Sequence, residues 1–497
     1  MNDGNRRVVP LAELVASCPG AELVGEGSAR VSGLHADSRE IRPGWLFAAL
    51  QGVRTTGSRF IEDALSRGAT ALLVSPDTPL PPGATPLSRI VHPRPRWALA
   101  HLAAAYFGHP ARSLRLFGIT GTNGKTTTTV LLATLLEALG ERPGLLGTTG
   151  IFFAGHSLPA THTTPDPVAL QEIFYRMVRA GCTAVVMEVS SHALDQERVA
   201  GLDFSGSVFT NLTQDHLDYH GTEEAYFAAK ARLFSEHTRE LAALWGEDAH
   251  AARLAALLPP EVRVLTFGQG EGWTVSAREI HRSWAGNRFR LVAEGASVPV
   301  VLPLCGDFNV SNALAAASMA HGLKLPLSEI AAALAHVQAP PGRFERLDAG
   351  QPFAVVVDYA HTPDALERLL RTARPLTSGR LICLFGCGGD RDRGKRPLMG
   401  AAVQALADRV ILTDDNPRNE DPAAIRAAIR AGMRKDDIIE IPNRRQAIRR
   451  AIALAQPGDA VLIAGKGHET VQIDARGCHP FSDRTEALLA LGELSSR

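Results

Sequence analysis

Residues 114–130 read LRLFGITGTNGKTTTTV, and this stretch decides the fold of the centre of the chain. An apolar, strand-like run leads into a loop bounded by Gly121 and Gly124, after which Lys125 and several threonines open a helix. The two glycines allow backbone N–H groups to turn toward an anion, and the helix presents the positive end of its dipole there. The pattern predicts a nucleotide-binding loop in which Lys125 meets the β- and γ-phosphates and the Thr126 hydroxyl holds Mg²⁺.

This stretch departs from the strict Walker pattern, because Ile119 stands where that pattern has glycine. An ordinary strand-to-helix turn is therefore the alternative interpretation. The strand, the glycine-bounded loop, the Lys-Thr pair and the helix are all present, so we predict that the chain binds ATP.

Length and composition indicate a multidomain, soluble, globular protein. The chain has 497 residues, and domains of about 150 residues predict three of them, at 1–93, 94–340 and 341–497. Lys plus Arg number 52 and Asp plus Glu also number 52, so no basic excess points to a nucleic-acid or membrane partner. No apolar run is long enough to span a bilayer, although 45% of the residues are hydrophobic.

The cysteines predict a reduced, cytoplasmic protein. They lack paired CxxC spacing and mostly lie in apolar runs, which is typical of small core residues and not of a disulfide framework or zinc site. The six are Cys18, Cys182, Cys305, Cys383, Cys387 and Cys478. The opening residues, MNDGNRRVVP, are not followed by an apolar segment, so we expect no secretory signal.

Alternating patterns predict an α/β fold of three domains. Short apolar runs before residue 93 indicate a small α/β domain. In the centre, LRLFGIT, TAVVMEVS and FSGSVFTNL are predicted strands of a parallel sheet, followed by helices around 223–256, a β-rich stretch at 260–300 and a helix in FNVSNALAAASMAHGL.

The last domain is predicted to be Rossmann-like and doubly wound. After Pro340, five apolar strands (FAVVVDYA, RLICLFGCGG, RVILTDD, DIIEI and DAVLIAG) alternate with helical segments. Gly386, Gly388 and Gly389 follow one strand, but the third glycine of a dinucleotide fingerprint would fall at Arg391, so we reject NAD binding.

Two segments behind central strands carry groups suited to metal and phosphate chemistry. Glu188, in MEVSSH, ends a buried strand where open α/β sheets present ligands, although a solvated strand-end carboxylate is the alternative. His216 and His220, in TNLTQDHLDYH, are four apart, but Leu217 follows the first histidine, so the zincin motif fails. Mg²⁺ contacts and turn-capping histidines remain as alternatives.

Three loops of the last domain are expected at one sheet edge: GGDRDRGKRP at 388–397, DDNPRNEDP at 414–422 and GKGHE at 465–469. Asp421 is a predicted helix N-cap before Pro422, so Arg418 would lie beside a helix N-terminus and suit a carboxylate ligand. In the centre, THTTPDP at 161–167 could hold a phosphorylated or glycosylated substrate, with a Thr-Pro turn as the simpler alternative.

Together these motifs resemble the Mur ligases, the ATP-dependent amino-acid-adding enzymes of peptidoglycan synthesis. The resemblance rests on GTNGKTTT, MEVSSH, TNLTQDHLDYHG, YFAAKARLF, GDFNVSNALAA, PGRFE and VDYAHTPD, which follow the family's order across the chain. DSRE, DNPR and GKGHE resemble the members that add meso-diaminopimelate to UDP-N-acetylmuramoyl-L-alanyl-D-glutamate. Lysine-adding relatives usually lack the arginine of DNPR, so Arg418 would decide the amino acid.

The resemblance implies a role for each matched residue. It assigns the ATP site to Gly121, Thr122, Asn123, Gly124, Lys125, Thr126, Thr127, Asn309, Arg343 and Asp358. It makes Lys125, Glu188, His216 and Lys230 catalytic, with Thr126, Glu188, His216 and a carbamylated Lys230 as the Mg²⁺ ligands. It assigns the UDP-linked substrate to Ser38, His162, Thr163, Thr164, Ser190, Gln196 and Arg198. It assigns diaminopimelate to Arg391, Asp415, Asn416, Pro417, Arg418, Gly465 and Glu469.

Two departures and two rival classes accompany the resemblance. His162 stands where relatives often have asparagine, and Ala36 where leucine often precedes DSR. The implied reaction forms an acyl phosphate on D-glutamate, which the amine then attacks after the domains close. Folylpolyglutamate synthase or another Mur ligase is the nearest rival, and a P-loop kinase or nucleotide-regulated binding module is the rival from another class. We expect a monomer.

Overall fold

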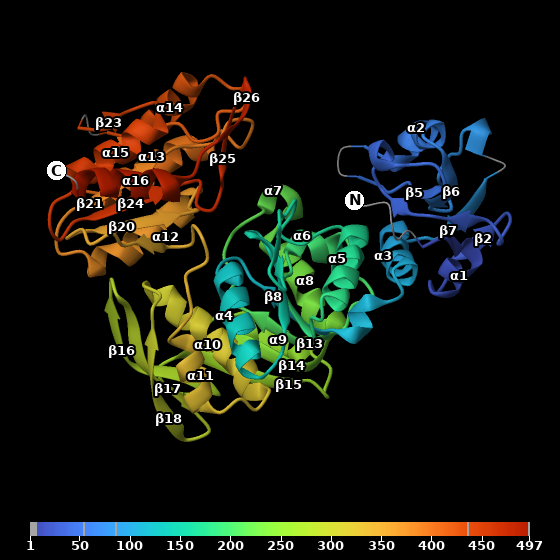
Figure 1. The fold of residues 1–497 in the computed structure, drawn as a ribbon, viewed down its shortest axis with the longest axis horizontal. Helices are drawn as coiled ribbons and strands as arrows, with labels where there is room; N and C mark the ends of the chain where they lie inside the picture. Colours follow the sequence, from blue (N-terminus) through green and yellow to red (C-terminus); the bar gives the residue numbers. More distant parts are fainter. Residues whose placement is uncertain (1–6, 53–54, 85–86, 435–436, 496–497) are drawn as a thin grey trace. The chain divides into compact units, whose positions relative to one another are not determined.

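The computed structural model describes residues 7–52, 55–84, 87–434 and 437–495. Residues 1–6, on which the expectation of no secretory signal partly rests, lie outside these ranges. The chain divides into two compact units, and Figure 1 shows its ribbon with the helices and strands labelled. The first runs to Gly268 and includes Trp273–Val275 and Ala315–Leu325, and the second comprises Gln269–Gly272, Ser276–Leu314 and Pro326–Arg497. The predicted three-domain division stays a prediction.

The first unit begins with a small α/β layer, as predicted. Its five-stranded sheet has the order β2-β7-β6-β5-β4, with β4 to β7 parallel and β2 antiparallel to β7. The strands are β2 (Glu22–Val24), β4 (Leu34–His35), β5 (Trp45–Ala48), β6 (Ala69–Val74) and β7 (Ser88–Val91), and a separate pair joins β1 (Val9–Pro10) to β3 (Arg30–Val31). The helices are α1 (Leu11–Ala16), α2 (Ile61–Ser66) and α3 (Pro95–Tyr106).

A larger, mostly parallel sheet forms the rest of the first unit, with the order β11-β10-β9-β12-β8-β13-β14-β15. Its strands are β8 (Arg115–Thr120), β9 (Pro143–Gly147), β10 (Gly150–Phe153), β11 (His156–Leu158), β12 (Ala184–Glu188), β13 (Phe204–Phe209), β14 (Thr238–Trp245) and β15 (Arg263–Gln269). Its helices are α4 (Lys125–Ala138), α5 (Pro167–Arg179), α6 (Ser191–Asp195), α7 (Leu217–His220), α8 (Glu223–Arg232) and α9 (Ala251–Leu257). The predicted strands β8, β12 and β13 are confirmed.

One prediction in this region is wrong. Residues 223–256 do not form helices throughout, because α8 passes through a π-helical turn at Leu233–His237 into β14. Leu241 and Leu244 are buried where β14 pairs with β13 and β15. Leucine and alanine favour a helix locally, but burial between two parallel strands overrides that preference.

After β15 come β16 (Val275–Ser283), β17 (Gly286–Ala293) and β18 (Ala296–Leu302), which confirm the predicted β-rich stretch and lie in the second unit from Ser276 onward. Helix α10 (Asp307–Gly322) belongs to the second unit up to Leu314 and to the first unit from Ala315, and α11 (Leu327–Leu334) belongs to the second unit. A six-stranded sheet follows, ordered β19-β20-β24-β21-β22-β23. Its strands are β19 (Glu345–Leu347), β20 (Ala354–Asp358), β21 (Leu381–Phe385), β22 (Arg409–Leu412), β23 (Ile439–Glu440) and β24 (Ala460–Ala464). Five of these are the predicted strands, whereas β19 and the hairpin β25 (Val471–Asp474) to β26 (Gly477–Pro480) were not predicted.

Helices cover both faces of this sheet, which confirms the doubly wound prediction. One buried cluster includes Leu366 of α12 (Pro363–Ala373), Val403 of α13 (Lys395–Leu406) and Ile429 of α14 (Pro422–Arg430). The other includes Ile448 of α15 (Arg444–Leu454) and Leu491 of α16 (Asp483–Ser495). The loops that follow β20, β21, β22 and β24 therefore leave from the same edge of the sheet, because these strands are parallel.

All six cysteines are free thiols in the structure, five of them buried and Cys478 exposed. In the described ranges, no helix is both long enough and apolar enough to cross a membrane.

Candidate active site

The loop between β8 and α4 has the backbone shape of an anion-binding loop. Gly121 has φ +147° and Gly124 has φ +85°. A Cβ added to Gly121 would lie 1.9 Å from Thr210 Oγ1, so only glycine fits there. Since α4 begins at Lys125, the first N–H groups of that helix have no carbonyl partner within it and are available to a phosphate.

The end of β13 holds this loop in place. The Asn123 N–H donates to Asn211 Oδ1 at 2.9 Å, and the Thr122 N–H donates to the Asn211 carbonyl at 2.9 Å. The Thr210 hydroxyl donates to the Asn123 carbonyl at 2.6 Å. These contacts with the residues that follow a neighbouring strand hold the backbone of the loop in one shape.

Glu188 and Thr126 meet beside the loop. Glu188 ends β12 with 1% of its surface exposed, and its Oε1 accepts 2.9 Å from the Thr126 hydroxyl. Thr148 adds its backbone N–H at 2.8 Å to Oε1 and its hydroxyl at 3.1 Å to Oε2. Thr148 was not predicted, because nothing in GTTG distinguishes it from a turn. The structure therefore places a buried carboxylate and a hydroxyl, both suitable Mg²⁺ ligands, at the start of α4.

Lys230 projects from α8 into the same region, and the structure buries it almost completely, with 1% exposed. Its Nζ donates to the Gly121 carbonyl at 2.9 Å and lies 4.4 Å from the centroid of the Tyr226 ring. Loss of solvent, reinforced by the charge of Lys125, holds the pKa of Lys230 well below its usual range. The amine is therefore disposed to be neutral and nucleophilic.

His216 stands at the N-cap of α7 with φ +54°. Its ring lies 4.8 Å from that of His192, edge to face, and its Nδ1 lies 3.6 Å from Asp215 Oδ1. Partial burial lowers the pKa of His216, and of His192 to about 4. A neutral imidazole can ligate a metal through its free nitrogen, so the local setting suits the predicted role.

A cavity of about 710 Å³ in the first unit collects four of the seven residues predicted for the UDP-linked substrate. These four are Ser38, His162, Gln196 and Arg198. Arg198 donates to Gln196 Oε1 at 2.9 Å, so the two side chains orient each other. The cavity also exposes an apolar wall at Leu50 and Phe60. Its size and mixed lining suit a large, polar, partly apolar ligand.

The other three predicted residues connect this cavity to Glu188. The buried Thr164 hydroxyl donates to the Glu188 carbonyl at 2.8 Å, and the Thr164 carbonyl accepts from Arg198 Nη1 at 2.7 Å. The Ser190 N–H donates to Thr164 Oγ1 at 3.1 Å, and the Thr163 hydroxyl lies 3.1 Å from that of Thr148. Hydrogen bonds thus link Arg198 of the cavity through Thr164 to the backbone carbonyl of Glu188, and Thr163 lies beside Thr148, which donates to the Glu188 carboxylate.

The second unit brings most of the residues predicted for diaminopimelate to one sheet edge. Arg418, after β22, has φ +53°, and its Nη1 donates to the Gly389 carbonyl at 2.7 Å. A Cβ on Gly388 would lie 2.8 Å from that nitrogen, so the glycines rejected as a dinucleotide motif make room for the arginine. Asp421 caps α14 by accepting 3.0 Å from the Ala423 N–H, as predicted.

The remaining predicted residues of this edge differ in burial. Asp415 and Asn416 are buried, Pro417 is buried beside them, and Arg391 is exposed. A Cβ on Gly465 would lie 2.6 Å from Asp415 Oδ2, so the GKGHE loop packs closely against the DNPR loop. Asn416 Nδ2 donates to Glu469 Oε2 at 2.7 Å. Lys466 donates to both Asn416 and Glu469 and was not predicted, although a lysine one residue after an apolar strand was a signal for it.

Two of the three remaining ATP-site predictions lie together in the second unit. Asp358 accepts backbone N–H groups of Phe344 at 2.7 Å and Ala360 at 2.8 Å, and burial raises the pKa of Asp358. The Arg343 guanidinium lies 4.9 Å from the Tyr359 ring centroid, and its positive charge acts on the Asp358 carboxylate. Asn309 lies on α10 instead, where it donates to the Cys305 carbonyl at 2.7 Å.

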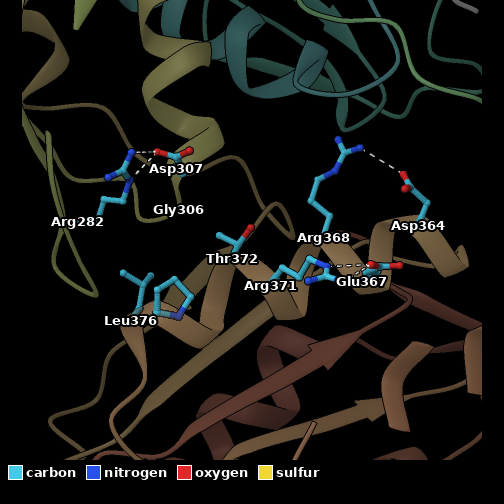
Figure 2. A pocket seen from close by; sticks show the side chains of 10 residues that line it. Arg282, Gly306, Asp307, Asp364, Glu367, Arg368, Arg371, Thr372 and Leu376 are labelled. Atoms are coloured by element: carbon cyan, nitrogen blue, oxygen red, sulfur yellow. Dashed lines mark hydrogen bonds and ion pairs between the residues drawn. The ribbon is translucent and has the colours of Figure 1, made fainter. Parts of the chain in front are cut away.

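A further cavity, of about 550 Å³, lies in the second unit and contains none of the predicted residues (Figure 2). Its charged side chains pair with one another: Arg282 with Asp307, Arg368 with Asp364 and Arg371 with Glu367. Because each arginine already has a carboxylate partner, we assign this cavity no ligand.

Comparison with known proteins gives the family. A model described as Mur ligase family, catalytic domain, matches residues 30–107, one described as Mur ligase middle domain matches 119–320, and one described as Mur ligase, glutamate ligase domain, matches 342–467. The UDP-N-acetylmuramoyl-L-alanyl-D-glutamate–2,6-diaminopimelate ligase of Synechococcus elongatus is 46% identical over 98% of this chain and 99% of its own length. The chain belongs to the Mur ligase family.

Solved structures agree with this assignment. A structure of a UDP-N-acetylmuramoyl-L-alanyl-D-glutamate–2,6-diaminopimelate ligase aligns with a TM-score of 0.70 and 35% identity. The alignment covers 98% of this chain and 100% of that one. MurF ligase from Thermotoga maritima in complex with ADP aligns with a TM-score of 0.59, 19% identity and coverage of 93% and 98%, which shows a shared fold.

Proposed function

We propose that this chain is an ATP-dependent ligase that adds meso-2,6-diaminopimelate to the D-glutamate of UDP-N-acetylmuramoyl-L-alanyl-D-glutamate in peptidoglycan synthesis. One observation carries the proposal. Glu188 accepts from Thr126 of the nucleotide loop, while its backbone carbonyl accepts from Thr164, whose own carbonyl accepts from Arg198 in the large cavity. Phosphoryl transfer needs the nucleotide and the acceptor carboxylate next to each other, and this chain of contacts supports that arrangement.

The chemistry follows from the acceptor. A carboxylate resists an amine because it is anionic and has no leaving group. Transfer of the γ-phosphoryl group makes an acyl phosphate, and the Lys125 ammonium with the N–H groups of α4 stabilises the charge on the transferring group. Attack by the amine then gives a tetrahedral intermediate that expels phosphate and leaves an amide.

We propose that the nucleotide phosphates bind Gly121, Thr122, Asn123, Gly124, Lys125, Thr126 and Thr127. We further assign Asn309, Arg343 and Asp358 to the nucleotide on the basis of the family resemblance. The shape of the loop supports the first set, and the grouping of Arg343 with Asp358 supports part of the second.

Mg²⁺ is the metal that this site fits. Among the described residues, no group of three or more His, Cys, Asp or Glu side chains is arranged to hold a metal alone. Mg²⁺ commonly binds one or two protein oxygens together with substrate phosphates, which matches the pair of Thr126 and Glu188. We propose Thr126, Glu188, His216 and the Lys230 carbamate as its ligands, where the ion would neutralise phosphate charge.

The second unit supplies the amino-acid site in this proposal. The far end of diaminopimelate carries a carboxylate and an ammonium on one carbon, whereas lysine carries an ammonium alone. Arg418 suits that carboxylate, and Glu469 suits that ammonium. We propose Arg391, Asp415, Asn416, Pro417 and Gly465 as the rest of this site. Ser38, His162, Thr163, Thr164, Ser190, Gln196 and Arg198 are proposed to bind the UDP-linked dipeptide.

A single assay tests the function. The purified chain is incubated with ATP, Mg²⁺ and UDP-N-acetylmuramoyl-dipeptide, with diaminopimelate or lysine, and the product is weighed by mass spectrometry. We expect the diaminopimelate tripeptide and an equal amount of ADP. ¹⁸O placed in the D-glutamate carboxylate should appear in the released phosphate, because the acyl phosphate transfers that oxygen. ADP release without an amide would contradict a ligase, and equal use of lysine would contradict the assignment of diaminopimelate as the substrate.

The nature of ATP and of the UDP-linked precursor supports a cytoplasmic location, and we propose that the enzyme acts as a monomer.

A further inference from the structure

Lys466 is a fully buried lysine at the edge of the sheet that carries the proposed amino-acid site. It follows β24 and Gly465, within GKGHE, and its side chain is 0% exposed. Its Nζ donates to Asn416 Oδ1 at 2.8 Å and to Glu469 Oε2 at 2.8 Å. A buried ammonium is costly unless it is paired, so these two acceptors account for its place in the structure.

The carboxamide of Asn416 makes three hydrogen bonds within the protein. Its Oδ1 accepts from Lys466 and also from the Ile473 N–H at 3.0 Å, and its Nδ2 donates to Glu469 Oε2 at 2.7 Å. With 3% of its surface exposed, its carboxamide joins the loop after β22, the loop after β24 and strand β25. The Asn416 side chain therefore stabilises the arrangement of these two loops and β25 at the edge of the sheet.

Glu469 differs from its two partners, because one of its oxygens is left for a ligand. Oε2 accepts from both Lys466 and Asn416. Among the described residues, no hydrogen bond to Oε1 is found, and the side chain remains 28% exposed. Two donors on one oxygen restrict the carboxylate to a single orientation and leave the other oxygen for a substrate donor.

We propose that Lys466 is a positioning residue for the amino-acid substrate: it fixes Glu469 and Asn416 so that Glu469 Oε1 meets the ammonium at the far end of diaminopimelate. This inference rests on the proposed function and adds to it a residue that has no predicted role. It requires that removal of Lys466 weaken amino-acid binding through Glu469 and leave the nucleotide and the UDP-linked substrate unaffected.

The test compares Lys466→Met, Glu469→Gln and the double variant, with each Michaelis constant measured at saturating levels of the other two substrates. Lys466→Met should raise the Michaelis constant for diaminopimelate roughly 10- to 100-fold, the range expected for a charge-assisted contact, and change that for ATP less than about threefold. In the Glu469→Gln background, Lys466→Met should raise the Michaelis constant for diaminopimelate by less than a further factor of about three. The reason is that the Glu469 carboxylate, through which Lys466 acts, is already lost.

Arg380→Met is the matched control. Arg380 pairs with Asp459 at 2.6 Å, and these residues precede β21 and β24, at the opposite ends of the strands from GKGHE. This variant also breaks an ion pair of the same domain, and we expect it to change stability without changing the Michaelis constant for diaminopimelate. Should Lys466→Met fail to fold, Lys466→Gln, which keeps a donor but no charge, carries the same comparison.

Two results would overturn the inference while the ligase assignment stands: an unchanged Michaelis constant for diaminopimelate in a folded Lys466 variant, or equal losses from Lys466→Met with and without Glu469→Gln. If the unaltered enzyme forms no diaminopimelate amide at all, the proposed function fails and this inference fails with it.

Discussion

Lys125 and Lys230 donate to the same backbone carbonyl, that of Gly121, each at 2.9 Å. Two ammonium groups on one carbonyl repel each other, and the pKa of Lys230, already lowered by burial, falls further because Lys125 is charged. The environment therefore gives the two lysines different roles. Lys125 also donates to the Thr122 carbonyl at 3.0 Å, and we propose that it meets the phosphates, whereas burial disposes Lys230 to be the neutral amine that CO₂ requires.

Replacing Lys230 tests the second half of this division. A neutral amine captures CO₂ as a carbamate anion, whereas the guanidinium of Lys230→Arg stays charged and forms no such anion. We expect activity to fall by about 100-fold or more, in line with the loss of a preorganised electrostatic group. In ¹³C-bicarbonate, NMR should show a carbamate signal in the unaltered protein and none in Lys230→Arg. Full activity of the folded variant would mean that Mg²⁺ is held without this lysine.

Replacing Lys125 tests the first half. Because its ammonium is proposed to stabilise charge on the transferring phosphoryl group, Lys125→Ala should lower turnover by about 100-fold or more, equivalent to about 3 kcal/mol. Amino-acid-dependent ADP release is the measurement. A near-normal rate in a variant with an unchanged melting temperature would contradict the assignment of the nucleotide loop.

Arg418 should decide between diaminopimelate and lysine. Its guanidinium is held by the Gly389 carbonyl and fits the space left by Gly388, so a substrate carboxylate would meet a fixed donor. Arg418→Ala should raise the Michaelis constant for diaminopimelate by about one to two powers of ten, the value of a charge-assisted bond of roughly 1.5–3 kcal/mol, with that for ATP nearly unchanged. The ratio of catalytic efficiencies for the two amino acids is the decisive measurement. A variant that keeps the original preference would place selectivity elsewhere.

Glu420 predicts a pH-dependent contribution to stability. Hydrogen bonds from Arg396 and from the Asp390 N–H lower the pKa of Glu420 to about 2. Because the folded-state value is depressed, the stabilisation is complete above the ordinary glutamate range and is lost as pH falls toward 2. In urea unfolding, Glu420→Gln should therefore have a lower free energy of unfolding than the unaltered protein near neutral pH. The difference between the two free energies should become smaller as the solution is acidified.

Glu493→Gln is the control for that measurement. Glu493 pairs with Arg449 at 2.8 Å, but both side chains are exposed, and such pairs contribute little to stability. The unfolding free energy of Glu493→Gln should equal that of the unaltered protein at each pH. A Glu420→Gln deficit that is constant with pH would show that the carboxylate charge is not what stabilises this loop.

Local patterns in the sequence predicted the elements whose shape depends on neighbouring residues. Gly121 and Gly124 predicted the nucleotide loop because only glycine adopts those backbone angles readily. Asp421 and Pro422 predicted the start of α14 because capping is a contact between near neighbours. The same local reasoning was wrong for β14, whose leucines and alanines form a strand only because two other strands enclose it.

By itself, then, the sequence determined the class of fold, the glycine-bounded loop before α4 and the family to which the chain belongs, because these depend on short motifs and their order. Only the tertiary structure decided which side chains share a partner. Lys230 reaches Gly121 across 109 positions, Glu188 reaches Thr126 across 62, and Lys466 reaches Asn416 across 50. No local pattern encodes such pairs, since burial and charge act through space once the strands are assembled, and they set the pKa of Lys230 and the orientation of Glu469.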